Sequence, residues 1–165
     1  MQKSEQNNAY KWNHHYLLFL LSRLTGGEIE NVVRYKTLKE LSNLSGFTEK
    51  TVSTLLKDLE KHDLIEKERD YIFGRGRGVN SYRIFKKFKK YQTLTGFNDL
   101  IIDRIISSDT PPKEKYLLII LTLDSDRCGV VRLTFDELIE ITKFSRQTLQ
   151  RTLEKTVNNG TVFGF

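Results

Sequence analysis

Residues 37–52 carry the clearest structural signal in the chain, and they read Thr37-Leu-Lys-Glu-Leu-Ser-Asn-Leu-Ser-Gly-Phe-Thr-Glu-Lys-Thr-Val. Thr37 is placed as the N-cap of a helix that we expect over Leu38–Leu44. Gly46 is expected to end that helix, because glycine readily adopts the left-handed conformation found at helix C-termini. Thr48 is placed as the cap of the next helix. The segment therefore predicts a short helix, a tight turn and a longer helix.

The longer helix is expected over Thr48–Lys61, with two different faces. Apolar side chains recur at helical spacing on one face, at Val52, Leu55, Leu56 and Leu59. The other face carries polar side chains, at Glu49, Lys50, Ser53, Thr54 and Lys57. Such a helix packs its apolar face against a core and presents its polar face to solvent or to a partner.

A β-hairpin is expected after this helix, over Leu64–Phe85, with a tip rich in glycine. Its glycines lie between two strand-like runs, whereas a nucleotide-binding glycine loop opens a helix, so we do not expect a nucleotide site. Residues 71–90 contain seven basic side chains and no acidic one. Such a stretch repels itself and favours a polyanionic partner, with a solvated basic linker as the alternative.

The second half of the chain repeats the pattern of the first. Residues 37–52 align without gaps with residues 134–149 at an offset of 97, and Tyr16–Leu21 aligns with Tyr116–Leu121 at an offset of 100. In the second copy Ser145 is placed as the cap of the longer helix. We interpret the two segments as copies of one structural unit, with chance similarity of amphipathic helices as the alternative.

Composition narrows the class of protein. The chain has 165 residues, which fits one ordinary domain or two small ones. Its longest apolar run, Tyr16–Leu21, is shorter than the ~20 residues of a membrane span, and the N-terminal residues show no signal-peptide pattern. The single cysteine, Cys128, excludes a disulfide framework and a cysteine-based zinc site. We expect a cytoplasmic protein with no membrane partner and no cofactor.

The arrangement of these segments resembles a winged helix-turn-helix DNA-binding domain. The matching segments are Leu17–Leu24, Leu38–Leu44, Thr48–Lys61 and the wing Leu64–Phe85. Residues 37–66 are similar to MarR-type regulators and to the helix-turn-helix of phage and plasmid replication proteins. Two such units in one chain resemble the two-domain plasmid replication initiators. The resemblance implies a mainly α fold with a small β-hairpin wing, built as a tandem of two winged helix-turn-helix units.

Three segments follow from this organisation. We expect a first winged-helix unit with a basic wing over residues 10–90, a connector helix with a Pro-Pro stop over 91–112, and a second helix-turn-helix over 113–165. The second unit departs from the pattern because Lys143 replaces Gly46, and because Phe165 aligns with the place where a wing would begin, so its wing is absent or truncated. The connector is expected to pack on the first unit or to form a homodimer seam.

The resemblance and the charge distribution together predict a sequence-specific protein for double-stranded DNA, with transcriptional regulation as the favoured use. Residues 1–90 carry a net charge of +7 and residues 91–165 a net charge of −1. Lysine and arginine donate to guanine, glutamine pairs with adenine, and basic or hydroxyl groups bind phosphate. The candidate DNA contacts are Thr48, Lys50, Ser53, Thr54, Lys57, Arg75, Arg77, Arg83, Arg146, Gln147, Gln150 and Arg151.

Two other uses stay open. The protein is alternatively a replication initiator of a plasmid or phage origin, or its second unit is an interaction module for a transcription or replication protein. Catalysis and metal binding are not expected, because the adjacent His14 and His15 point in different directions on a helix and the paired carboxylates fit solvated helix faces. The expected location is the cytoplasm, in association with the nucleoid.

Overall fold

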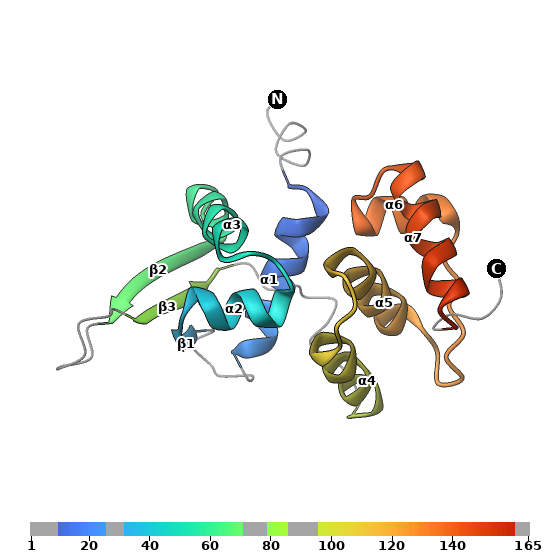
Figure 1. Cartoon of the computed structure of the whole chain (residues 1–165), viewed down its shortest axis with the longest axis horizontal. Coiled ribbons are helices and arrows are strands. Elements are labelled where there is room, and N and C mark those ends of the chain that lie inside the picture. Colours follow the sequence, from blue (N-terminus) through green and yellow to red (C-terminus); the bar gives the residue numbers. More distant parts are fainter. Residues whose placement is uncertain (1–9, 26–31, 71–78, 86–95, 161–165) are drawn as a thin grey trace. The chain divides into compact units, whose positions relative to one another are not determined.

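The computed structural model describes residues 10–25, 32–70, 79–85 and 96–160. The chain divides into two compact units. The N-terminal unit comprises residues 13–92, and the C-terminal unit comprises residues 93–165 together with residues 1–12. The described residues are mainly helical, with one small antiparallel sheet in the N-terminal unit (Figure 1). This confirms the predicted mainly α fold class with a β-hairpin.

The N-terminal unit combines helices with a short sheet. Its described elements are, in chain order, α1 (Trp12–Leu24), β1 (Val32–Lys36), α2 (Leu38–Ser45), α3 (Glu49–Lys61), β2 (Ile65–Asp70) and β3 (Val79–Ile84). The strands lie in the order β1-β3-β2, and both pairings are antiparallel. β2 and β3 form the predicted hairpin, in which Ile65 lies opposite Ile84 and Lys67 opposite Tyr82. The predicted hairpin tip, residues 71–78, lies outside the described residues.

The caps of α2 and α3 agree with the local sequence rules. The amide of Glu40 donates to the Thr37 hydroxyl oxygen at 3.1 Å, and the Glu40 carboxylate accepts from the amide of Thr37 at 2.7 Å. This reciprocal pair is a capping box. Gly46 ends α2 with φ 74°, in the left-handed region. Thr48 then caps α3 by accepting the amide of Thr51 at 3.2 Å.

One hydrophobic core joins the helices of the N-terminal unit to its sheet. α3 contributes the four apolar residues predicted from its periodicity, and the hairpin contributes three side chains that alternate along its strands. The buried cluster consists of Leu17, Leu18, Leu21, Val33, Leu41, Val52, Leu55, Leu56, Leu59, Ile65, Tyr82 and Ile84. Because α3 buries this face, its position relative to the hairpin is fixed and its opposite face points outward.

The N-terminal unit also differs from the sequence prediction in two places. Strand β1 was not predicted, because it is short and its pairing with β3 is not visible in the local sequence. The first helix begins at Trp12 rather than at Leu17, because the residues between them lack a continuous apolar pattern. These corrections add a third strand and one helical turn to the unit.

The C-terminal unit is entirely helical apart from one isolated β-bridge between Ser125 and Val131, as far as its described residues show. It consists of α4 (Gly96–Ser107), α5 (Pro112–Asp124), α6 (Phe135–Thr142) and α7 (Arg146–Asn158). α5 contacts each of the other three helices. The short helix and the longer helix predicted for the second copy are therefore present as α6 and α7.

The helix predicted as a connector packs within the C-terminal unit. α4 lies against α5, and the Lys115 Nζ atom on α5 donates to the carbonyl oxygen of Ile106 at 2.7 Å. Burial lowers the pKa of the Lys115 ammonium group. The expectation that this helix packs on the first unit is therefore wrong, whereas the homodimer seam stays a prediction. Ile102 and Ile106 are buried within the C-terminal unit, because the short link before Pro112 turns α4 back against α5.

Candidate nucleic-acid interface

A row of polar side chains runs along α3 on the side opposite its buried face. Lys50, Thr54, Lys57 and Lys61 follow one another at intervals of four, three and four residues, so they align along the helix axis. We call these four residues the α3 row. All four side chains are exposed, whereas the apolar residues on the other side of α3 are buried. The α3 row is thus a surface that the core itself orients outward.

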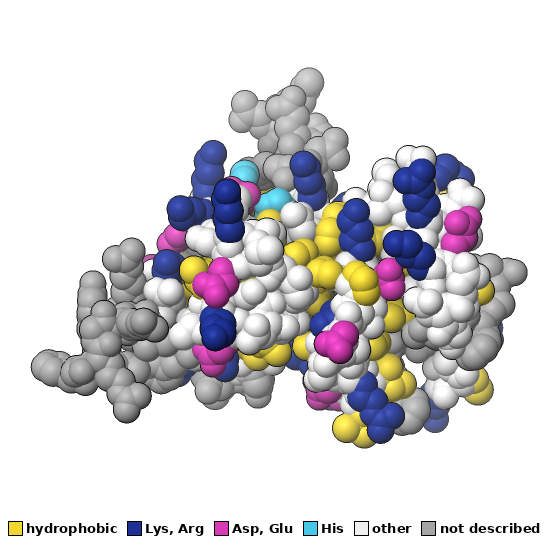
Figure 2. Space-filling view, in the orientation of Figure 1, with side chains coloured by type: hydrophobic (Ala, Val, Ile, Leu, Met, Phe, Trp, Pro, Cys, Tyr) yellow, Lys and Arg dark blue, Asp and Glu magenta, His cyan; other side chains and the backbone are white. Residues whose placement is uncertain are grey.

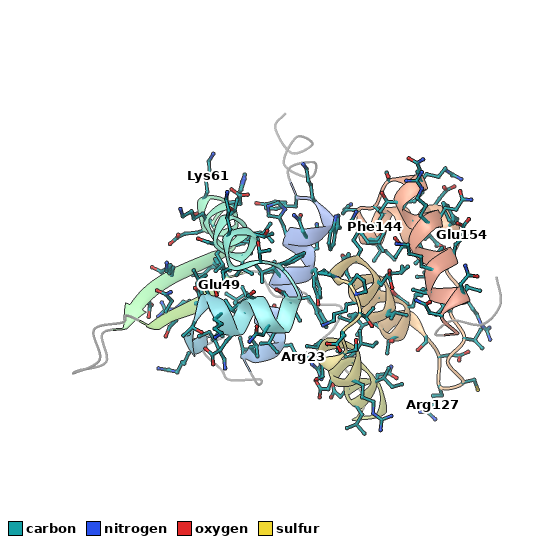
Figure 3. All side chains as sticks on the ribbon, in the orientation of Figure 1. Arg23, Glu49, Lys61, Arg127, Phe144 and Glu154 are labelled. Carbon is teal, nitrogen blue, oxygen red and sulfur yellow. The ribbon has the colours of Figure 1, made fainter. Side chains whose placement is uncertain are left out.

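The α3 row is positively charged. It contains three lysines and no acidic residue, and none of the three lysines forms an ion pair with a residue in the described part of the chain. Figure 2 shows Lys and Arg side chains standing over α3, and Figure 3 labels Glu49 and Lys61 at its two ends. The nearby carboxylate of Asp58 lies off the row, 3.3 Å from the Nε2 atom of His14 on α1.

Lys61 was absent from the candidate residues predicted from the sequence. The signal for it was present, because Lys61 follows Lys57 by four residues and Lys50 by eleven, which places all three on one helical face. The α3 row therefore extends one turn further than the predicted contact surface. Ser53, another predicted contact, lies half-buried beside the row.

The predicted contacts on the hairpin have a different outcome. Arg75 and Arg77 lie outside the described residues. Arg83 is on β3, and its guanidinium group lies 3.0 Å from Glu68 and 3.8 Å from Glu66, both on the neighbouring strand β2. These carboxylates offset its charge, so Arg83 acts first as a cross-strand partner. The run of basic residues in the sequence did not reveal this pairing.

The α6–α7 turn reproduces the main hydrogen bonds of the α2–α3 turn. The Ser45 hydroxyl donates to the carbonyl of Leu41 at 2.7 Å and accepts from the amide of Phe47 at 3.2 Å. The corresponding bonds of Thr142, to the carbonyl of Leu138 and from the amide of Phe144, measure 2.6 and 3.3 Å. The same capping box also recurs, between Thr134 and Glu137. The offset of 97 residues is therefore a repeat of structure as well as of sequence.

Lys143 has the same role as Gly46 in spite of its side chain. Its φ is 58°, in the left-handed region, and its amide donates to the carbonyl of Ile139 at 2.9 Å. The amide of Gly46 makes the equivalent bond to Ser42, also at 2.9 Å. The departure from the sequence pattern at this position therefore leaves the geometry of the turn unchanged.

The exposed face of α7 carries different chemistry. Gln147, Arg151, Glu154 and Asn158 occupy the positions that correspond to the α3 row, and we call them the α7 row. The α7 row contains one positive and one negative side chain, so its net charge is zero. Glu154, labelled in Figure 3, stands where α3 has Lys57.

Two of the predicted contacts on α7 have partners within the unit. The Arg146 guanidinium group lies 2.6 Å from the Asp136 carboxylate and 5.2 Å from the centre of the Phe135 ring. The Gln150 side-chain amide donates to Glu154 at 3.1 Å. Gln147 and Arg151 are exposed on the α7 row. Of the four predicted contacts on α7, two therefore have partners within the unit and two lie exposed on the α7 row.

The described histidine, cysteine and carboxylate side chains do not gather into a metal site. No group of three or more His, Cys, Asp and Glu side chains among them is arranged to hold a metal ion. Cys128 is exposed in the α5–α6 loop, where its amide donates to Asp126 at 2.9 Å. That bond and the one from the amide of Val130 lower the pKa of the Asp126 carboxyl group. The Asp126 carboxylate therefore holds the turn of the α5–α6 loop through these two amide bonds.

Two further properties bear on the class of the protein, namely the length of its helices and its similarity to known proteins. None of the helices in the described part of the chain is long and apolar enough to cross a membrane. No protein-family model, no curated protein and no solved structure matches the chain.

Proposed function

We propose that the protein binds double-stranded DNA sequence-specifically through a winged helix-turn-helix in its N-terminal unit, and that it acts as a transcriptional regulator. Three helices followed by the β2–β3 hairpin support the winged-helix assignment. The repeated turn of α6 and α7 supports a tandem of two helix-turn-helix units. In this proposal α3 enters the major groove and the hairpin contacts the backbone or the minor groove.

The α3 row is the observation that carries the proposal. A helix about 10–12 Å wide fits a major groove about 12 Å wide. Lys50 is in the first turn of α3, where a recognition helix contacts base edges, and its ammonium group donates to the O6 and N7 acceptors of guanine. Lys57 and Lys61, further along the same row, supply positive charge for phosphates.

Selection of binding sites from a random duplex library tests the proposal. We expect the full chain to enrich a defined sequence and to protect it in a footprint. Lys57→Gln should weaken binding to all duplexes by a similar factor and reduce the salt dependence by about one phosphate contact. Lys155→Gln, which removes an exposed lysine from α7, is the matched control. Absence of duplex binding by the wild-type chain at low salt would contradict the proposal.

A second candidate function applies to the C-terminal unit. At three equivalent exposed positions, Lys39, Asn43 and Lys57 of the first helix-turn-helix are replaced by three carboxylates, on Asp136, Glu140 and Glu154. The charge at these positions changes from +2 to −3, which opposes approach to phosphates. This difference favours a protein-interaction module for a transcription or replication partner.

A footprint separates the two functions of the C-terminal unit. If α7 contacts DNA, Arg146→Ala/Arg151→Ala should shorten the footprint of the full chain at one end. An unchanged footprint and affinity would favour the interaction module. The position of the selected site then distinguishes the uses of the protein, because a site in a divergent promoter supports a regulator and a set of iterated sites supports a replication initiator.

A further inference from the structure

The threonine that caps α3 and the threonines within α3 differ in what their hydroxyl groups can offer to a partner. Thr48 Oγ1 accepts the amide of Thr51 and lies 2.9 Å from the hydroxyl of Thr51, so both groups belong to the helix cap. Thr54 Oγ1 donates to the carbonyl oxygen of Lys50 at 3.0 Å. Its hydroxyl proton is thus used inside the helix. The exposed side chain of Thr54 then offers its γ-methyl group as an apolar contact.

We infer that Thr54 determines specificity for thymine, through contact of its γ-methyl group with the C5-methyl group of the base. This inference rests on the proposed function, because it requires α3 in the major groove. Thymine is the base that carries a methyl group there, and threonine methyl groups contact it without a hydrogen bond. Thr54 lies in the middle of the α3 row, one turn after Lys50, so the geometry brings both side chains to the same groove.

The position of the thymine relative to the guanine contacted by Lys50 follows from helix geometry. Side chains four residues apart on a helix are separated by about 5–6 Å at their Cβ atoms. Successive base pairs are about 3.4 Å apart along the duplex. The thymine should therefore lie within about two base pairs of that guanine in the selected site.

Deoxyuridine provides a direct test, because it is thymidine without the methyl group. Each thymine of the selected duplex is replaced in turn by deoxyuridine, and the dissociation constants of the full-length chain are measured. At one position wild-type protein should bind the deoxyuridine duplex about four-fold more weakly, the effect of one buried methyl group at about 0.8 kcal/mol. Thr54→Val keeps a methyl group, so it should retain this ratio, whereas Thr54→Ser should bring it close to one.

The outcomes separate this inference from the proposed function. If the chain binds the selected duplex but Thr54→Ser keeps the full deoxyuridine effect at every thymine, Thr54 is not the residue that contacts the methyl group. A selected site that shows no deoxyuridine effect at any thymine would overturn the inference in the same way. If no duplex is bound at all, the proposed function itself fails. Circular dichroism of both variants confirms that α3 remains folded.

Discussion

Lys57 and Arg83 are both exposed cations of the N-terminal unit, but their surroundings give them different uses. Lys57 stands on the α3 row with no ion pair to any described residue. The side chain of Arg83 is 47% exposed, yet carboxylates of Glu66 and Glu68 lie beside its guanidinium group. A paired cation contributes less to the field that attracts phosphates than an unpaired one. Local pairing, rather than the number of basic residues, therefore selects the candidate contacts.

Lys50→Ala should relax base preference at one position of the selected site. A specific contact between a lysine and guanine contributes about 1–3 kcal/mol of discrimination between bases. Repeating the site selection with the variant measures the effect, and Lys155→Ala is the control. An unchanged selected sequence would show that Lys50 does not contact bases.

Glu40→Gln should destabilise the N-terminal unit at neutral pH but not in acid. The amide and the hydroxyl of Thr37 donate to the Glu40 carboxylate, and these bonds lower its pKa in the folded protein. A carboxyl group with a lowered pKa stabilises the fold above its unfolded-state pKa and loses this contribution as the pH falls through the folded-state value.

The expected difference in the free energy of unfolding is roughly 0.3–1 kcal/mol at pH 7, typical of a charge at a helix N-terminus. Urea unfolding of both proteins at pH 7 and at about pH 3, well below the reference pKa of a glutamate, measures it. A difference that stayed constant between the two pH values would argue against the ionised capping box.

At the scale of elements, the two pairs of capped helices could be predicted from the sequence because their determinants are local. Thr37, Thr48 and Ser145 cap their helices as predicted, since each cap depends on an amide three residues away. Strand β1 and the Arg83–Glu68 pair were not accessible, because both depend on which strand lies next to β3. The α3 row lies between these cases, since helical spacing predicts its alignment but not the absence of ion pairs.

Lys143→Gly should stabilise the C-terminal unit. A residue with a Cβ atom is strained in the left-handed region, by roughly 1–2 kcal/mol, and glycine is not. Glycine also makes the unfolded chain more flexible, which opposes folding and offsets part of this stabilisation. The net increase in the free energy of unfolding should therefore be about 0.5–1 kcal/mol. Gly46→Ala at the equivalent turn should have the opposite sign. Urea unfolding measures both, and a destabilising effect of Lys143→Gly would contradict the left-handed geometry.

At the scale of the whole molecule, the two units contain similar turns between helices but differ in net charge. Residues 13–92 of the N-terminal unit carry a net charge of +6, and residues 93–165 together with residues 1–12 carry a net charge of zero. On α3 and α7 the same asymmetry recurs as three lysines in the α3 row against a neutral α7 row. The two units therefore differ in their expected attraction to a polyanion, although corresponding hydrogen bonds form the α2–α3 and α6–α7 turns.

Neutralising the α3 row should affect DNA binding far more than an equal change on α7. In the full chain, Lys50→Gln/Lys57→Gln/Lys61→Gln removes three positive charges, and so does Arg146→Gln/Arg151→Gln/Lys155→Gln. If all three lysines contact phosphate or replace a counterion, the slope of log Kd against log salt should fall by about 3 for the α3 variant. Equal losses of affinity and slope in both variants would show that the units share the duplex equally.

The corresponding hydrogen bonds of the two turns have a consequence for how such a protein can change. The hydroxyl groups of Ser45 and Thr142 that join each pair of helices are buried, and the residues of the two rows are not among their partners. Mutations of the rows are therefore separated from the atoms that maintain the backbone. A gene duplication that produced two such units would leave each free to acquire its own ligand. For the same reason, exchanging the residues of the α3 row and the α7 row should change which unit attracts a polyanion and leave the fold of both units unchanged.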